Sequence, residues 1–161
     1  MISILINTNC LIRLSDPAHS DHSVISNAVS TLQPTNTLVI VPQVLYEFWV
    51  VATKPTNSPR PGLGLSHDEA RALVTRFTEF FRLLRDERRV FENWIQLVYD
   101  YKVSGRAGHD ARLVAAMQRH DIDRILTFNP SDFVRYPEIS VATPSQILTQ
   151  SAPTAPSTYI R

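Results

Sequence analysis

The sequence predicts an α/β protein with a central, mostly parallel sheet that helices cover on both faces. Short apolar runs rich in branched residues alternate with segments of helical periodicity, and such alternation is typical of parallel strands joined by helical crossovers. The 161 residues, 43% hydrophobic, are enough for one core and too few for two domains. We expect one domain over residues 1–148 and a loosely ordered tail, rich in Ser, Thr and Pro, over 149–161.

Buried strands are expected at the continuous apolar runs, since these are too short for helices. The runs are residues 2–6, 38–41, 124–128 and, more weakly, 139–142.

The helices between them are marked by their ends and by their apolar spacing. Pro42 opens a helix that ends before Lys54-Pro55, and Ser66 with Glu69 forms a capping box for the next helix. Apolar residues at helical spacing extend this second helix to position 84, and similar patterns predict helices over 94–101 and 108–120. The apolar positions of the second helix are Ala70, Leu73, Val74, Phe77, Phe81 and Leu84.

Charge and cysteine content limit the class of protein only weakly. The formal net charge of +1 gives no global case for nucleic-acid binding, and the single Cys10 excludes an internal disulfide. No run of about 18 apolar residues is present, and the apolar N-terminus lacks the basic region of a signal peptide. We therefore expect a cytoplasmic protein that does not span a membrane.

Four polar positions are expected to meet at one rim of the sheet. Asn7 and Asp132 follow predicted strands, Glu47 lies in an otherwise apolar helix, and Asp110 lies in the first turn of another. Each has an ordinary structural explanation, such as a helix cap or a turn, but their convergence favours a shared site. Three carboxylates repel one another unless a cation lies between them, and hard oxygen ligands favour Mg²⁺ or Mn²⁺. Such a centre suits phosphodiester hydrolysis.

Four segments, in order along the chain, resemble the motifs of one nuclease family. They are residues 6–12 (Ile-Asn-Thr-Asn-Cys-Leu-Ile), 41–47, 104–114 and 126–133. On this ordered set the chain resembles the PIN-domain family, particularly the VapC-like toxins of bacterial toxin–antitoxin pairs. The resemblance implies a PIN-like α/β/α sandwich and a Mg²⁺- or Mn²⁺-dependent endoribonuclease with Asn7, Glu47, Asp110 and Asp132 as its catalytic and metal-binding positions. It also implies an RNA substrate, a homodimer, and a cognate antitoxin whose tail enters the acidic groove.

One position departs from the family pattern, which has aspartate where this chain has Asn7. An amide oxygen still binds metals, but the exchange removes one negative charge and introduces an NH₂ donor. We expect weaker metal binding and strongly reduced cleavage. A natural variant and a deliberate inactivation both explain Asn7, and the otherwise intact motifs favour the second.

Other functions and weaker signals are compatible with parts of the sequence. A non-catalytic RNA- or protein-binding module that lost its chemistry through Asn7 is the main alternative. A receiver domain is disfavoured, because paired acids at one strand end are missing. Residues 62–66 do not follow a strand and have no P-loop lysine, so they are not a phosphate loop. Lys102, Arg106 and Arg112 flank Asp110 and are candidates for phosphate contacts, and His109 is expected to make a structural hydrogen bond.

Overall fold

The computed structural model describes residues 1–152, which fold around one five-stranded sheet. All four strand pairings are parallel, and the strand order is β3-β2-β1-β4-β5. The strands are β1 (Ile2–Ile6), β2 (Asn36–Ile40), β3 (Arg82–Leu83), β4 (Arg124–Leu126) and β5 (Ser140–Ala142). The predicted parallel α/β architecture is therefore confirmed.

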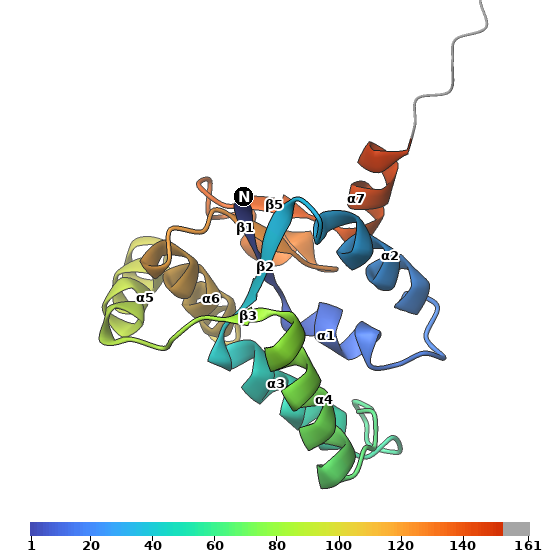
Figure 1. Ribbon diagram of the computed structural model, residues 1–161. Helices are drawn as coiled ribbons and strands as arrows, with labels where there is room; N and C mark the ends of the chain where they lie inside the picture. Colours follow the sequence, from blue (N-terminus) through green and yellow to red (C-terminus); the bar gives the residue numbers. More distant parts are fainter. Residues whose placement is uncertain (153–161) are drawn as a thin grey trace, which may run out of the picture.

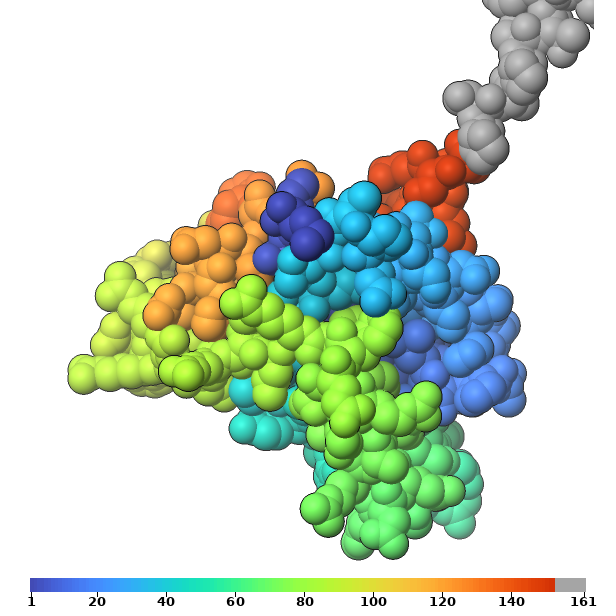
Figure 2. All heavy atoms as spheres, viewed as in Figure 1, coloured from blue at the N-terminus to red at the C-terminus, as the bar shows by residue number. Residues whose placement is uncertain are grey.

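Helices enclose the sheet in two groups and extend beyond it in a third. The helices are α1 (Thr8–Leu14), α2 (His22–Leu32), α3 (Pro42–Thr53), α4 (His67–Phe80), α5 (Arg88–Asp100), α6 (Ala107–Arg119) and α7 (Pro144–Ser151), with a short 3₁₀ helix η1 (Pro130–Phe133). Figure 1 shows α1, α2 and α7 on one side of the sheet and α5 with α6 on the other. The α3–α4 pair projects away from the body of the molecule, as a distinct lobe in Figure 2.

The core lies between the sheet and these helices. The last residues of the inner strands are fully buried, among them Leu5 and Ile6 of β1 and Leu126 of β4, as is most of the inner face of α6. Burying each such aliphatic side chain contributes about 1.5–3 kcal/mol. The central strands are thus fixed in register, and so is the rim at their carboxyl ends. No helix of residues 1–152 combines the length and the apolar character that crossing a membrane requires.

The structure corrects the predicted end of the capping-box helix. The Ser66–Glu69 capping box is present, but α4 ends at Phe80, so Phe81 and Leu84 are not helical. Phe81 adopts an extended backbone and turns into the core, and β3 follows, with Leu83 paired to Ile40 of β2. A strand of two residues is too short to show an alternating pattern, and the flanking Phe81 and Leu84 happen to continue the helical spacing of α4.

Smaller differences concern strand bounds, helices and the tail. The expected strands at 38–41, 124–128 and 139–142 are shifted or shorter by one or two residues, and α1, α2 and α7 were not anticipated. Residues 149–151, assigned to the tail, complete α7, while residues 153–161 lie outside the described part of the chain.

Candidate functional site

A cleft of about 670 Å³ opens at the carboxyl ends of the strands, where α1, α3, α6 and η1 meet. Glu47 on α3, Asp110 in the first turn of α6 and Asp132 in η1 all line it. Of the four positions predicted to meet at one rim, these three carboxylates line the same cleft. The remaining lining residues are Thr8, Val50, Val51, Arg106, Ala107 and His109.

The electrostatic environment of Asp110 reflects its neighbours. Burial, followed by the negative charges of Asp132 and Glu47, raises the pKa of Asp110 from 3.8 to about 6. His109 and Arg106 act in the opposite direction and lower this pKa. Burial and the two neighbouring carboxylates together thus outweigh the effect of these basic residues on the pKa of Asp110.

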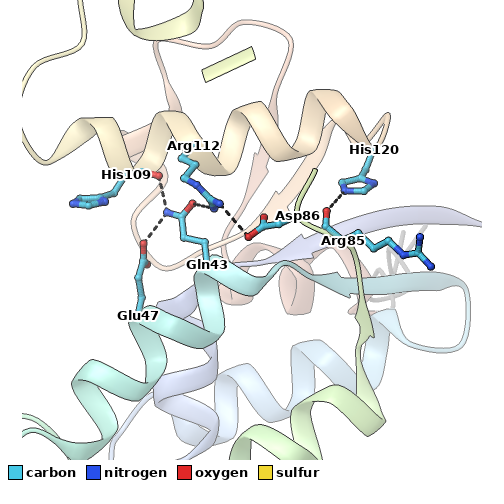
Figure 3. Close-up of polar contacts among 7 residues, drawn as sticks. All are labelled: Gln43, Glu47, Arg85, Asp86, His109, Arg112 and His120. Atoms are coloured by element: carbon cyan, nitrogen blue, oxygen red, sulfur yellow. Dashed lines mark hydrogen bonds and ion pairs between the residues drawn. The ribbon is translucent and has the colours of Figure 1, made fainter. Parts of the chain in front are cut away.

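Glu47 is held at both carboxylate oxygens. The Thr8 hydroxyl donates to Oε2 over 2.8 Å, and the Gln43 amide donates to Oε1 over 2.7 Å (Figure 3 draws the second bond). Thr8 is the first residue of α1, and Gln43 lies one turn before Glu47 on α3. A carboxylate on an otherwise apolar helix needs hydrogen-bond donors, and Glu47 has two of them.

Asn7 lies beside the cleft and is buried, with 6% of its surface exposed. It caps α1, since its Oδ1 accepts a hydrogen bond of 2.7 Å from the Thr8 backbone N–H. Its Nδ2 donates to the Thr127 hydroxyl over 2.9 Å. Asn7 is not among the residues that line the cleft, unlike its neighbour Thr8.

The surroundings of residue 7 suit a carboxylate better than an amide. The buried Thr127 hydroxyl faces three donors, Asn7 Nδ2, Asn9 Nδ2 and the Asn129 N–H, at 2.9–3.1 Å, whereas a hydroxyl has two acceptor sites. Turning the Asn7 amide over relieves Thr127 but directs the NH₂ group at the Thr8 N–H. A carboxylate at this position accepts from both Thr8 and the Thr127 hydroxyl, which satisfies every group.

The residues of the cleft fit a divalent cation in donor chemistry and charge. Glu47, Asp110 and Asp132 offer hard oxygen donors, and their mutual repulsion is the kind that a cation relieves. In the present side-chain conformations, however, the three carboxylates do not surround a common position. Within residues 1–152, no three histidine, cysteine, aspartate or glutamate side chains are close enough together to enclose a metal ion. Side-chain rotation would therefore have to accompany cation binding.

The three cations flanking Asp110 in the sequence have different environments. Arg106 lines the cleft, as expected of a phosphate contact. Arg112 does not line the cleft and binds Gln43 over 3.0 Å and Asp86 over 3.1 Å, so its guanidinium already has partners within the chain. The Lys102 ammonium lies 4.1 Å from the centroid of the Tyr99 ring.

The family model of the PIN domain matches residues 4–139, a span that contains all four candidate positions. The chain belongs to the PIN-domain family. The PIN-like fold that the sequence motifs implied is confirmed, and the cleft lies at the carboxyl ends of its strands. No curated protein matches this PIN chain.

Solved structures share this PIN fold at low sequence identity. VapBC2 from Rickettsia felis, bound to a fragment of its promoter DNA, is 15% identical with a TM-score of 0.67, covering 89% of this chain and 98% of that chain. A toxin–antitoxin complex from Klebsiella pneumoniae is 23% identical with a TM-score of 0.60, covering 88% and 97%. VapC20 from Mycobacterium tuberculosis, a toxin that cleaves the sarcin–ricin loop, is 17% identical with a TM-score of 0.58, covering 76% and 86%.

Two residues of the site were not anticipated from the sequence. Thr8 and Gln43 both bond to Glu47, and Gln43 also reaches α6. The available signal was the four-residue spacing of Gln43 and Glu47, which places both side chains on one face of α3.

Proposed function

We propose that this chain is a toxin-type endoribonuclease that depends on Mg²⁺ or Mn²⁺ and is attenuated by Asn7. The observation that carries the proposal is the convergence of Glu47, Asp110 and Asp132 in one cleft, where burial and these neighbouring charges raise the pKa of Asp110 to about 6. Membership of the PIN-domain family, and a fold shared with VapBC toxins, supports this chemistry.

Each residue has a role set by its surroundings. Glu47, Asp110 and Asp132 would hold the cation, and Arg106, which lines the same cleft, would bind a phosphate of the RNA backbone. When bound, the cation supplies a Lewis acid for the phosphoryl oxygen and lowers the pKa of the attacking water. Thr8 and Gln43 each bond to one oxygen of the Glu47 carboxylate and so orient this residue.

Attenuation follows from the loss of charge at residue 7. The Asn7 oxygen already accepts from the Thr8 N–H, and its NH₂ group competes for the Thr127 hydroxyl. An aspartate in the same place adds a negative charge next to Thr8, which lines the cleft, and removes the competing donor. The groups around residue 7 would therefore accommodate an aspartate, but this chain has an asparagine there.

A second candidate is a non-catalytic RNA- or protein-binding PIN module. It is favoured by one observation: both polar atoms of Asn7 are already hydrogen-bonded, so Asn7 serves as a helix cap without any metal. Such a module does not require Glu47, Asp110 and Asp132 to bind a cation.

The test compares the present chain with its Asn7→Asp variant on RNA in the presence of Mn²⁺. We expect the variant to cleave at least about tenfold faster, since altered metal surroundings typically change activity by 10- to 100-fold. Asn7→Asp combined with Asp110→Asn is the control, and it should abolish the gain. No cleavage by either protein would favour the binding module, whereas equal cleavage by both would show a nuclease that Asn7 does not attenuate.

The partners follow the same proposal. Several similar structures are toxin–antitoxin complexes, and we propose that a cognate antitoxin binds this chain in the cytoplasm. We further propose a homodimer, supported by the exposed apolar side chains of Phe91, Ile95 and Tyr99, which follow one another at four-residue spacing on the outer face of α5.

A further inference from the structure

The amide of Gln43 makes three hydrogen bonds at the junction of α3 and α6. Its Nε2 donates to Glu47 Oε1 over 2.7 Å and to the His109 carbonyl over 2.8 Å, and its Oε1 accepts from Arg112 Nη1 over 3.0 Å. Figure 3 shows Gln43 between these three groups. Gln43 itself is buried, with 5% exposure, whereas the bonds to its partners are only partly buried.

Gln43 connects two elements that otherwise have separate packing partners. α3 packs against α1 and α4, whereas α6 packs against α5. Within residues 1–152, the hydrogen bonds that join α3 to α6 all have Gln43 as one partner. The connection is extended by Arg112, which also binds Asp86 in the segment between β3 and α5.

The two ends of this connection are two carboxylates of the cleft. Glu47 is bonded directly, and His109, whose carbonyl accepts the second bond, immediately precedes Asp110 in the first turn of α6. We propose that Gln43 is a positioning residue, which sets the placement of Glu47 relative to Asp110 and thereby the affinity of the cleft for a divalent cation. This rests on the proposed function.

A glutamine is the side chain that these neighbours require. The carboxylate of Glu47 and the carbonyl of His109 each need a donor, and the Arg112 guanidinium needs an acceptor. Glutamate offers no donor to the first two, and methionine has the length but none of the polar atoms. The three bonds therefore depend on the amide and not only on the volume of the side chain.

The experiment measures Mn²⁺ binding by the decrease in the electron paramagnetic resonance signal of free Mn²⁺. It is carried out on the present chain and on Asn7→Asp, each with and without Gln43→Met. We expect Gln43→Met to weaken Mn²⁺ binding by about 10- to 100-fold, the range found when partners of metal ligands are removed. Backbone hydrogen exchange should also become faster at the start of α6, because the His109 carbonyl loses its anchor.

The matched control is Asn93→Ala, which removes a bond of 3.3 Å from α5 to the carbonyl of Ala115, a residue of α6 that lies five positions beyond Asp110 and does not line the cleft. It should leave Mn²⁺ affinity within about twofold. Should Gln43→Met not fold, Arg112→Met removes the third bond of the amide together with the Arg112–Asp86 ion pair, and it is expected to weaken Mn²⁺ binding less, in the same direction.

Three results would contradict the proposal in distinguishable ways. If the parent proteins bind Mn²⁺ and Gln43→Met binds it equally well, the positioning role is wrong while the proposed function stands. If Asn93→Ala weakens binding as much as Gln43→Met, the effect is one of general stability, and the positioning role is again wrong. If neither parent binds Mn²⁺, the metal-dependent function itself fails, and the role of Gln43 fails with it.

Discussion

Asp110 is subject to burial and to two neighbouring carboxylates at once, and this has a consequence for stability. Its folded pKa of about 6 exceeds the ordinary value of 3.8, so between these two pH values the folded chain holds the proton that the unfolded chain has released. Stability without metal therefore falls as the pH rises through this window, and the penalty is complete above it. A bound cation would offset the same penalty.

Asp110→Asn should remove this pH-dependent penalty. We expect the variant to melt at a higher temperature than the parent at pH 8 in EDTA, with an advantage that shrinks as the pH falls towards 4. Thermal unfolding followed by circular dichroism measures the effect. Asp123→Asn, at an exposed position outside the cleft lining, is the control and should show no such trend. A constant difference at all pH values would contradict the account.

The candidate site was predictable to the extent that strand ends fix positions. Asn7 and Asp132 follow neighbouring parallel strands, and this places them on one rim whatever the details of the helices. The role of Gln43 was not predictable, because the hydrogen bonds of a buried amide depend on which groups the fold places around it. His109 and Arg112 lie 66 and 69 residues away in sequence, and only the packing of α6 brings them near.

Among the elements, the connection between α3 and α4 shows how a loop satisfies a helix end. Residues 62–65 return over the last turn of α3, and their backbone N–H groups donate to carbonyls near its end, including those of Val51, Ala52 and Lys54. Gly62 is at the closest approach, since a Cβ there would overlap the Val51 oxygen and lie 2.5 Å from the Lys54 oxygen. Gly62 therefore has a structural role in this loop, which its sequence excluded as a phosphate-binding loop.

Gly62→Ala should destabilise the protein, because the obstructing oxygens belong to the backbone and cannot rotate away. We expect a loss of about 1–3 kcal/mol in the free energy of unfolding, measured by urea denaturation. Gly108→Ala is the matched control, since a Cβ there meets nothing within 4 Å and alanine favours a helix by up to about 1 kcal/mol. Equal stability of Gly62→Ala and the parent would show that the loop is not packed as described.

Elements with strong local signals were predictable, and those stabilised by their surroundings were not. α3 begins at Pro42 and ends before Lys54-Pro55, as its own residues require. β3 consists of two residues and exists because it pairs with β2, and α1 begins at once after β1, capped by the same Asn7 that marks the site. β3 and α1 are both too short to produce a recognisable periodicity of apolar residues in the sequence.

At the scale of the whole molecule, we propose that α5 is the element that pairs with a second copy of the chain. Arg88 and Arg89 lie in its first turn and Asp100 in its last, which is the reverse of the order that the helix dipole prefers. An antiparallel copy of α5 would place the basic end of each helix, where Arg88 and Arg89 pair with Glu92, near the acidic end of the other, with the exposed apolar side chains between them.

Ile95→Glu should therefore convert a dimer into a monomer, because it buries a charge at the centre of this face. Light scattering coupled to size-exclusion chromatography gives the mass. Tyr46→Glu, on the exposed surface of α3, is the control and should remain dimeric. A parent protein that is already monomeric at high concentration, or a dimer that Ile95→Glu does not affect, would show that this face is not the interface.

The cleft as a divalent-cation centre, completed by an acid at residue 7, is tested most directly by a crystal structure. Crystals of Asn7→Asp are grown with Mn²⁺, and anomalous diffraction locates the metal. We expect a peak within coordination distance of Glu47, Asp110 and Asp132, and a weaker peak at the same place in the present chain. No peak in the cleft of Asn7→Asp, or a peak only outside it, would contradict this assignment.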